Sequence, residues 1–242
     1  MQISGQGVLI TGASRGLGRA LAEALAARGA RVAMVARDAG PLSDAVATIR
    51  ARGEIAHAIV ADISEKDAVH RIAGQAQGLV GDLGIAIHNA STLGPVPLRL
   101  LLDTECEDLA AVLETNLVGP FRLTKIVAGA MALRGEGVIV HVSSDAAVEA
   151  YPRWGAYGVS KAAQDQLSRV LAAELEGTGV RVLAIDPGEM DTKMHADAMP
   201  EADPSTLQRP ADVAAKIVAM IEDAARAPSG ARLVAPAWLE AS

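Results

Sequence analysis

The sequence predicts an α/β fold in which about seven parallel strands form one doubly wound sheet flanked by helices. Short runs rich in β-branched residues alternate along the chain with stretches of helical periodicity. Strict alternation of this kind implies parallel strands joined by right-handed crossovers. The composition agrees, because 50% of the residues are hydrophobic while only 2% are aromatic. Such an aliphatic bias suits strands that are buried on both faces.

The length of the chain favours a single domain covering residues 1–242. A chain of 242 residues can bury one sizeable core, and an α/β domain of this length is ordinarily one unit. The candidate strands are short runs bounded by Gly or Asp. They span residues 7–11, 31–36, 55–61, 84–90, 138–143, 180–185 and 231–235.

Helical stretches lie between these strands. After the first strand, Leu17, Leu21 and Leu25 recur every four residues and so share one face of a helix. A second clear helical stretch is AAQDQLSRVLAAEL, residues 162–175. Each helix of this kind can carry the chain back along the sheet to the start of the next parallel strand.

One segment between a strand and a late helix breaks the alternation. Residues 190–210 are polar and punctuated by prolines. A long irregular insertion in such a place is often a lid or a binding loop. We therefore predict a substrate loop at about 189–210, with a solvated surface loop as the alternative interpretation.

A glycine-rich motif follows the first strand. The sequence T-G-A-S-R-G-L-G, residues 11–18, places Gly12, Gly16 and Gly18 where the strand turns into a helix. Glycines there allow a tight turn and let the backbone approach a pyrophosphate at the positive end of the helix. This context predicts a dinucleotide site in a Rossmann-type sheet. A glycine-rich turn without a ligand is the alternative.

The end of the second strand predicts which dinucleotide is bound. That strand ends in Ala36, Arg37 and Asp38. An acid at the first of these positions would repel a 2′-phosphate, whereas the planar cation of Arg37 is suited to bind one. Arg15 could reach the same phosphate from the glycine loop. We therefore predict NADP(H) in preference to NAD(H); alternatively, Arg37 pairs with Asp38 at the surface and Asp38 receives the ribose.

A tyrosine and a lysine four residues apart predict acid-base chemistry. Tyr157 and Lys161 project from one face of the helix that continues through residues 162–175. A free tyrosine has a pKa of about 10 and exchanges protons poorly at neutral pH. A neighbouring ammonium favours the phenolate and lowers that pKa. Ser143 and Ser144 end the preceding strand, at the sheet edge where ligands gather.

Taken together, these motifs resemble the short-chain dehydrogenase/reductase family in its compact single-domain branch. The resemblance runs from residue 5 to about 235. Beyond the glycine motif and Y-G-V-S-K at 157–161, it is carried by residues in the family's order and spacing. These are Asp62 in VADIS, Asn89-Ala90, Asn116 in ETNLVGP, Ser144, and Pro187-Gly188 with Thr192 in DPGEMDT.

The resemblance implies a catalytic tetrad. Tyr157 would be the general acid that protonates a substrate carbonyl oxygen, and the base in the reverse direction. Lys161 would lower the pKa of Tyr157 and hold the nicotinamide ribose. Ser144, which lies at the family's usual thirteen-residue interval from the tyrosine, would hydrogen-bond the same carbonyl oxygen. Asn116 would hold a water that relays protons to Lys161.

The resemblance also implies the contacts to the dinucleotide. Asp62 would contact the adenine, while Thr192 and the backbone after Pro187 would hold the carboxamide. One departure from the family is Ser91, which replaces a glycine close to the cofactor. The implied cofactor-binding residues are Gly12, Ser14, Arg15, Gly16, Leu17, Gly18, Arg37, Asp62, Ile63, Asn89, Tyr157, Lys161, Pro187, Gly188 and Thr192.

Three further residues are candidates for the substrate side. Tyr151 and Trp154 lie between Ser144 and Tyr157, where an aromatic pair could give a flat apolar wall for a carbonyl compound. The alternative is that they only anchor this loop on the helix. His195 is the one histidine in the predicted substrate loop. The five histidines show no metal-ligand spacing, so we predict no metal.

The resemblance implies an NADPH-dependent oxidoreductase of the carbonyl reductase type, acting on a small carbonyl compound or, in reverse, a secondary alcohol. A redox sensor that binds NADP(H) without turnover is the first alternative. Such proteins generally lose the tyrosine or the lysine, and both are present here. An isomerase or dehydratase of the nucleotide-sugar type is the second, although those relatives are longer than 242 residues.

Charge and cysteine usage limit the partners and the compartment. A net charge of −7 argues against nucleic acid and anionic membranes, which usually need a basic face. No apolar run reaches the ~18 residues of a membrane span, and no signal peptide is recognisable. The single Cys106 fits a reducing cytoplasm. The resemblance implies a homodimer or homotetramer, formed through the helix around 106–133 and the tyrosine-bearing helix.

Overall fold

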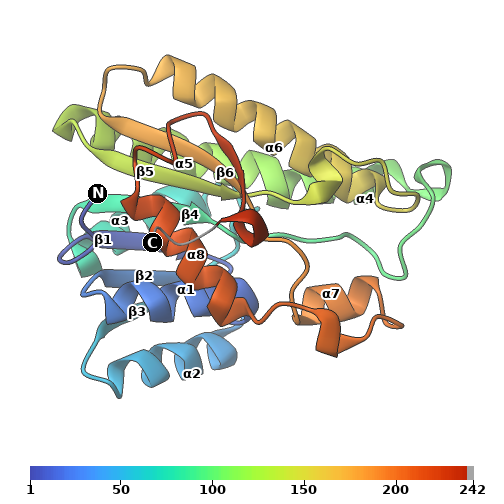
Figure 1. The fold of residues 1–242 in the computed structure, drawn as a ribbon, viewed down its shortest axis with the longest axis horizontal. Helices are drawn as coiled ribbons and strands as arrows, with labels where there is room; N and C mark the ends of the chain where they lie inside the picture. The colour runs from blue at the N-terminus through green and yellow to red at the C-terminus, as the bar shows by residue number, and fades with distance from the viewer. Residues whose placement is uncertain (239–242) are drawn as a thin grey trace.

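Seven parallel strands form one sheet at the centre of the structure, a computed structural model that describes residues 1–238 (Figure 1). The spatial order is β3-β2-β1-β4-β5-β6-β7, so the order along the chain reverses between β1 and β4. Ligand crevices form at such a reversal, beyond the carboxyl ends of the strands. The strands are β1 (Gly7–Thr11), β2 (Arg31–Ala36), β3 (Ile55–Val60), β4 (Leu83–His88), β5 (Gly137–Val142), β6 (Val180–Asp186) and β7 (Arg232–Val234).

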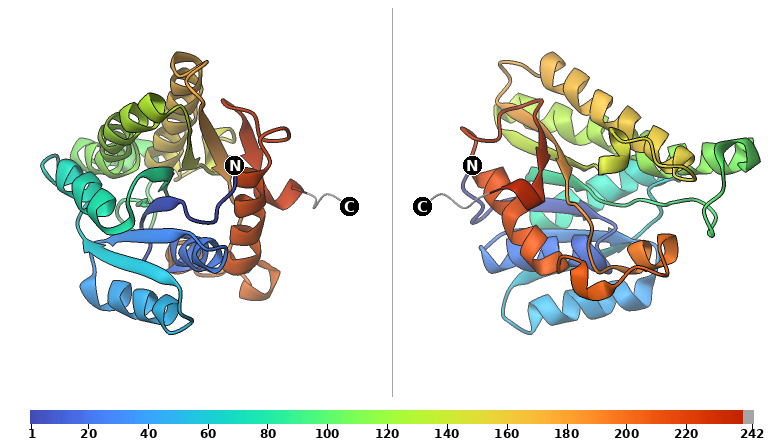
Figure 2. Two further views of the ribbon diagram at one scale, coloured as in Figure 1. Left: turned by 90° about the vertical axis from the view of Figure 1, so that its left-hand side faces the viewer. Right: turned by 45° about the vertical axis from the view of Figure 1, so that its right-hand side comes forward.

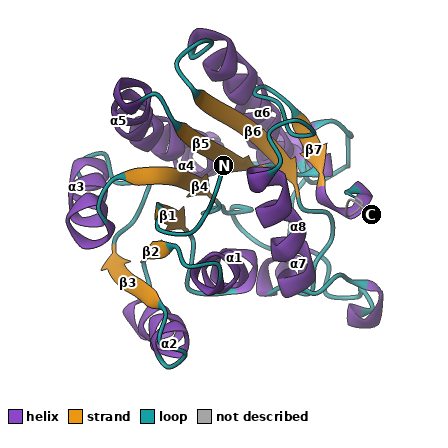
Figure 3. Cartoon of the chain, turned by 60° about the vertical axis from the view of Figure 1, so that its left-hand side comes forward, coloured by secondary structure: helices purple, strands orange, loops and turns teal. Residues whose placement is uncertain are grey.

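Helices cover both faces of this sheet (Figures 2 and 3). One face packs against α1, α2 and α8, and the other against α3, α5 and α6. Side chains that alternate along a strand enter the two cores in turn: Val8 and Ile10 face one core, and Leu9 faces the other. The helices are α1 (Gly16–Ala27), α2 (Ala39–Arg50), α3 (Ala68–Val80), α4 (Cys106–Leu113), α5 (Gly119–Arg134), α6 (Gly155–Glu174), α7 (Lys193–Ala198) and α8 (Pro210–Glu222).

The predicted fold class is confirmed: the structure has a Rossmann-type α/β fold with a single doubly wound sheet. Each of the seven predicted strands is a strand of that sheet, with ends that differ by at most two residues. These runs are apolar because both faces of the sheet are covered, and so they stand out in the sequence.

The helix expected around 106–133 is interrupted. A π-helical turn at Glu114–Val118 separates α4 from α5. Such turns insert a residue into the helical ladder and are frequent at functional sites. Here the turn carries Asn116, whose side chain is fully buried.

The segment predicted as an irregular loop contains a short helix. Thr192 caps α7 by accepting a hydrogen bond from the His195 backbone N–H (3.3 Å). The base of the segment is closed by hydrogen bonds that join Asp191 to Gln208 (3.0 Å) and Gln208 to Glu189 (3.2 Å). The segment is therefore an ordered excursion that projects beyond the sheet next to the start of α1 (Figure 2, right).

None of the helices within residues 1–238 has both the length and the apolar character needed to cross a membrane.

Candidate active site

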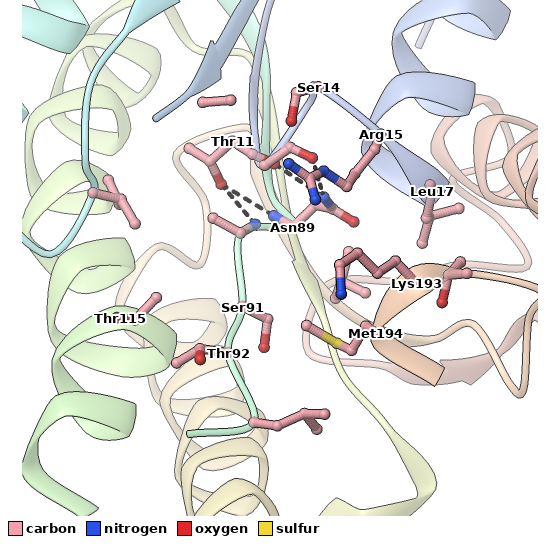
Figure 4. A pocket seen from close by; sticks show the side chains of 18 of the residues that line it. Thr11, Ser14, Arg15, Leu17, Asn89, Ser91, Thr92, Thr115, Lys193 and Met194 are labelled. Carbon is pink, nitrogen blue, oxygen red and sulfur yellow. Dashed lines mark hydrogen bonds between the residues drawn. The ribbon is translucent and has the colours of Figure 1, made fainter. Parts of the chain in front are cut away.

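A cleft of about 570 Å³ opens at the carboxyl ends of the central strands (Figure 4). Its walls come from the turns that follow β1 to β5, from α6 and from the segment that leads into α7. Its volume lies in the range of small-molecule and cofactor sites. All predicted cofactor-binding residues line it except Gly18 and Gly188.

The glycine loop forms the floor of the cleft. Gly12 has a φ of +67° and Gly16 a φ of +52°, a backbone region that side chains rarely adopt. A Cβ atom on Gly12 would lie 2.8 Å from the Ala90 Cα. The Asn89 side chain fixes the loop by donating to the carbonyls of Thr11 (3.1 Å) and Gly12 (3.0 Å) (Figure 4). The Asn89 side chain therefore holds the glycine loop in place.

The start of α1 suits an anion. Arg15 is the N-cap residue, yet its side chain makes no capping hydrogen bond. The first backbone N–H groups of a helix otherwise need such a partner, and together with the helix dipole they favour a phosphate. Gly18, one turn further, allows α1 to approach β1, because a Cβ there would lie 2.3 Å from the Gly12 oxygen. The residues present therefore fit a pyrophosphate.

Two arginines lie at the far end of the cleft. Arg37 is 3.5 Å from the carboxylate of Asp62, and Arg15 is 2.5 Å from that of Asp38. The alternative in which Arg37 pairs with Asp38 is therefore wrong. Burial alone would raise the pKa of Asp62, but hydrogen bonds from Ser64 and the charge of Arg37 lower it below its usual value. Arg37 remains 70% exposed and Arg15 49% exposed, so both guanidinium groups can turn toward a ligand.

Tyr157 lies at the inner end of the cleft and is almost fully buried. Burial raises its pKa to about 12, and the charges of Asp186 and Asp145 act in the same direction. The nearby hydroxyl groups of Ser144 and Ser91 oppose this shift. The predicted lowering of the Tyr157 pKa is therefore not met in the chain by itself, because burial and the nearby carboxylates outweigh the two serine hydroxyls.

The position of Lys161 explains this difference. Its Nζ donates to the carbonyl oxygen of Val142 (2.6 Å) and to Oε1 of Gln164 (3.3 Å). It lies 5.5 Å from the centre of the Tyr157 ring. Burial lowers the pKa of Lys161 to about 8, and the charge of Asp165 partly offsets that effect. Burial thus favours the neutral forms of both Tyr157 and Lys161 more than water does.

Asn116 is tied to its surroundings through every polar group. Its amide exchanges two hydrogen bonds with the backbone of Thr92 (2.8 and 2.9 Å) and donates to the Ser160 hydroxyl (2.9 Å). Its carbonyl oxygen accepts from Nε2 of Gln164 (2.9 Å). The Gln164 amide therefore joins the Asn116 backbone to Lys161, in the place where we expected a relaying water.

Ser144 caps the short turn that follows β5. Its hydroxyl donates to Asp145 (2.9 Å) and accepts from the Ala146 N–H (3.2 Å). It also lies near enough to Tyr157 to lower the pKa of that phenol, whereas Ser143 is the serine that lines the cleft. Of the four residues predicted to be catalytic, Tyr157 and Lys161 line one end of the cleft, Ser144 lies beside Tyr157 outside the lining, and Asn116 lies behind them.

The aromatic residues near Tyr157 do not line the cleft. Trp154 packs edge-on against Tyr157, with ring centres 5.8 Å apart, in an apolar cluster that includes Leu93 and Met194. Tyr151 is exposed and donates to the Asp145 carboxylate (3.0 Å). Trp154 therefore braces the tyrosine, whereas Tyr151 lies on the surface.

His195 also lies away from the cleft. Its Nε2 is buried without a hydrogen-bond partner among the described residues, 3.8 Å from the Glu189 carboxylate. The side of α7 that lines the cleft instead carries Lys193, Met194 and Asp197 (Figure 4). The sequence did not predict this short helix, and the helix turns His195 away from the cleft, where we had expected it to contact the substrate.

Two of the other histidines form a stacked pair behind the site. The rings of His88 and His141 are 4.9 Å apart and fully buried. His88 bonds Thr124 (2.8 Å) and His141 bonds Ser168 (2.9 Å). Burial lowers the pKa of His88 to about 4 and holds that of His141 well below its ordinary value of 6.5. Within residues 1–238, no group of three or more His, Cys, Asp or Glu side chains could hold a metal ion.

Sequence reasoning missed two polar residues of the site. Gln164 follows Tyr157 by seven positions and Lys161 by three, so helical spacing places all three on one face. A buried amide at that spacing was a detectable signal. Arg232, which contacts the Ser144 carbonyl oxygen (2.8 Å), gave no such signal, because it is far from Ser144 in the sequence.

Comparison with known proteins agrees with this geometry. The family model described as short chain dehydrogenase matches residues 6–203. A short chain dehydrogenase of Pseudocercospora fijiensis is 40% identical over 200 residues, which cover 81% of this chain and 63%, less than two thirds, of that protein.

Solved structures extend the similarity to nearly the whole chain. A short chain dehydrogenase of Shigella flexneri complexed with NADP has a TM-score of 0.90 at 27% identity and covers 97% of this chain and 98% of its own. An NAD⁺-bound xylitol dehydrogenase has a TM-score of 0.85 at 26% identity, with coverage of 97% and 98%. The glycine-lined cleft, the tyrosine and lysine on α6 and these matches lead to one conclusion: the chain belongs to the short-chain dehydrogenase/reductase family of oxidoreductases.

Proposed function

We propose that the protein is an NADP(H)-dependent oxidoreductase that transfers hydride between the nicotinamide and the carbonyl or secondary alcohol carbon of a small molecule. The observation that supports it most is that Tyr157 and Lys161 line the inner end of a cleft that also takes in the start of α1, with Ser144 beside the tyrosine. When bound, the nicotinamide supplies or accepts the hydride. The protein supplies the proton and the position.

Tyr157 carries the proton in this proposal. In reduction its hydroxyl donates to the carbonyl oxygen, which the Ser144 hydroxyl orients and stabilises as negative charge develops. Lys161 remains protonated at neutral pH, because its pKa is about 8. One of its donors is free of Val142 and Gln164, and it serves to hold a ribose hydroxyl and to favour the phenolate once the proton has left.

The preference for NADP(H) rests on Arg15 and Arg37. Both line the cleft, remain largely exposed and present planar guanidinium groups to a 2′-phosphate. The residue before Arg37 at the end of β2 is Ala36, so no acidic side chain stands there to repel the 2′-phosphate. Solved relatives hold either NADP or NAD⁺, so the proposed preference for NADP(H) rests on Arg15, Arg37 and Ala36 alone.

The substrate side of the cleft is apolar. Leu93 and Met194 line the cleft and pack in one apolar cluster with Tyr157, so the proposed substrate is a small carbonyl compound with an apolar body. We propose that α7 and the segment 189–210 cover it. The protein would work in the cytoplasm as a homodimer or homotetramer, formed through α5 and α6. The half-exposed side chains of Phe121, Val159 and Val170 on these helices support that interface.

One observation favours a redox sensor that binds NADP(H) without turnover. In the chain by itself Tyr157 has a raised pKa and Lys161 bonds Val142 instead of the tyrosine hydroxyl. A protein of this kind would bind the dinucleotide and signal its redox state through α7, without using the tyrosine.

The first experiment measures NADPH consumption by the purified protein against a broad panel of carbonyl compounds. Tyr157→Phe is assayed in parallel, with NADPH binding checked for both proteins. We expect turnover that is lost in the variant while NADPH still binds. Binding without turnover on any compound would instead favour the sensor.

The cofactor preference is tested on the same samples. Arg37→Ala should weaken NADPH binding by about 10- to 100-fold, as expected for a charge-assisted hydrogen bond, and leave NADH binding unchanged. Arg19→Ala is the matched control, since Arg19 lies on α1, pairs with Glu23 and does not line the cleft. Stronger binding of NADH than of NADPH by the wild type would contradict the assignment.

A further inference from the structure

We propose that Arg232, on the last strand of the sheet, is a positioning residue of the active site, because its guanidinium group joins the three elements that carry the reacting groups. Its Nη2 donates to the Ser144 carbonyl oxygen (2.8 Å) and to the Asp186 carboxylate (3.1 Å). Its Nε donates to the Asp165 carboxylate (2.9 Å). The inference rests on the proposed oxidoreductase function.

The register of β7 explains how Arg232 reaches the site. In the β6–β7 pairing Arg232 lies opposite Ala184, two residues before β6 ends at Asp186. Its side chain extends from that position to the end of β5 and to the middle of α6. The planar fork of a guanidinium group can meet three acceptors at once, which an ammonium on a flexible stem cannot do in the same geometry.

Each partner of Arg232 leads directly to a functional group. The Ser144 carbonyl belongs to the residue whose hydroxyl lowers the pKa of Tyr157. Asp186 accepts from the Gly188 N–H (2.9 Å) through its second oxygen, and so fixes the start of the turn that lines the cleft. Asp165 lies one helical turn after Lys161 on the same face of α6.

The contacts are largely shielded from water. The side chains of Asp165 and Asp186 are only 8% and 6% exposed, and that of Arg232 is 24% exposed. Buried carboxylates that lose their only cation are strongly destabilised. Among the described residues Arg232 is the one cation in ion-pair distance of either carboxylate.

The same charges act on Tyr157 and Lys161. The carboxylate of Asp186 raises the pKa of Tyr157, and that of Asp165 raises the pKa of Lys161. Arg232 lies between the two acids, so loss of its charge would expose both reacting groups to an uncompensated negative potential. The groups that act on Tyr157 are Asp186, Asp145, Ser144 and Ser91; those around Lys161 are Asp165, the Val142 carbonyl, Gln164 and His141.

A purely structural role would be to fasten β7 to the sheet. The two roles differ in their effect on pH dependence. Alcohol oxidation needs the Tyr157 phenolate, so its rate rises with pH along one limb of the pH profile. Loss of the Arg232 charge raises the pKa of Tyr157 and so shifts this limb to higher pH. A loose β7 lowers the amount of folded protein and leaves that limb in place.

The experiment measures kcat and KM for alcohol oxidation across pH with Arg232→Met and Arg232→Lys. We expect Arg232→Met to lose kcat by about 10- to 100-fold and to shift the limb upward by about one pH unit. Arg232→Lys keeps the charge, so it should restore the limb while kcat stays low. Arg19→Met is the matched control: Arg19 also bonds two side chains, Glu23 (2.8 Å) and Thr48 (3.2 Å), but lies on α1 and does not line the cleft. An unshifted limb in a folded Arg232→Met would overturn the proposal.

Two further measurements cover the other outcomes. If Arg232→Met does not fold, Asp165→Asn replaces it. Removal of this negative charge should shift the limb to lower pH and reduce kcat, and a wild-type profile would count against the proposal. If the wild type binds NADPH but turns over no substrate, the proposed function fails, and the Arg232 proposal is then tested without turnover.

That test uses the fact that the chain has only two tyrosines. Protein labelled with 3-fluorotyrosine gives one ¹⁹F signal for each, and Tyr151→Phe assigns the remaining signal to Tyr157. The fluorine also lowers the phenol pKa into a more accessible range. We expect the Tyr157 midpoint to rise by about one pH unit in Arg232→Met and to stay unchanged in Arg19→Met. An unmoved midpoint in both would refute the proposal.

Discussion

Tyr157 and Lys161 lie in an environment that opposes the charged form of each side chain. With pKa values of about 12 and about 8, the tyrosine is a neutral phenol at pH 7 and the lysine still carries its proton. This is a suitable resting state for reduction, in which the phenol gives up a proton and the ammonium stabilises the phenolate that remains. Lys161 therefore needs ligands that hold it without taking its proton.

The amide of Gln164 is such a ligand. Its orientation is fixed, because Nε2 donates to the Asn116 carbonyl and Oε1 is left to accept from Lys161. An amide oxygen in this position stabilises the ammonium over the neutral amine.

Gln164→Leu should therefore lower the pKa of Lys161 below about 8 and reduce kcat at pH 8 by about tenfold, with a smaller loss at pH 6, where the lysine remains charged. The pH profile of kcat tests this expectation. Gln166→Leu is the matched control, since Gln166 is exposed on the same helix and pairs with Arg169. Equal losses at both pH values would show that Gln164 only fills space.

At the residue scale the sequence revealed those side chains whose roles are tied to short motifs. The tyrosine, the lysine and the glycines lie in local patterns that geometry requires. Arg232 and Gln164 were missed, because their contacts depend on neighbours that only the assembled sheet and helices provide. His195 was misplaced for a related reason: the direction of its side chain depends on α7, which the polar sequence did not reveal.

At the scale of elements, buried strands were the easiest to predict. Each is a short aliphatic run, because helices cover both of its faces. The helix α7 was missed since it has only six residues and depends on the Thr192 cap and on the closed base of its segment. The π-helical turn was missed because it is a local change of hydrogen bonding within an otherwise continuous helical pattern.

The approach of α1 to β1 gives a prediction at this scale. A Cβ atom at position 18 would lie 2.3 Å from the Gly12 oxygen and 2.5 Å from Nδ2 of Asn89, so the helix must move or the glycine loop must open. Gly18→Ala should destabilise the protein by about 1–3 kcal/mol and weaken NADPH binding at least about tenfold. Chemical denaturation and equilibrium binding measure the two effects.

A second glycine isolates the effect of crowding from that of helix propensity. Gly74 lies inside α3, and no atom comes within 4 Å of a Cβ placed there. Gly74→Ala should therefore stabilise the protein by about 0.5–1 kcal/mol without changing NADPH binding. If both variants behaved alike, the packing of α1 on β1 would not be what shapes the cleft.

At the scale of the whole molecule, the reversal of strand order between β1 and β4 brings distant segments to one edge of the sheet. The glycine loop, Asn89, Ser144 and the residues after Asp186 all follow strands, so a parallel sheet must gather them. The sequence therefore predicted the position of the cleft together with the fold. It could not predict how β7 pairs at the edge, and this pairing brings Arg232 to the site.

The central strands also couple two buried histidines to global stability. His88 and His141 lie opposite each other in the β4–β5 pairing, so neither can gain water without opening the middle of the sheet. The folded pKa of His88 is about 4, below its ordinary value of 6.5. Between these pH values the unfolded chain binds a proton that the folded chain does not. Stability is therefore fully present above pH 6.5 and is lost as the pH falls toward 4.

We expect the free energy of unfolding to fall by about 3 kcal/mol across this window for His88 alone, with an additional loss for His141, whose pKa burial also lowers well below 6.5. Urea denaturation at a series of pH values measures the slope. His88→Asn, which removes the titrating ring, should reduce the slope by about 1.4 kcal/mol per pH unit. His70→Asn, at an exposed position on α3, should leave the slope unchanged. A His88→Asn variant with the wild-type slope would mean that the acid sensitivity arises from the carboxylates, and that the core of the sheet tolerates a charged imidazole.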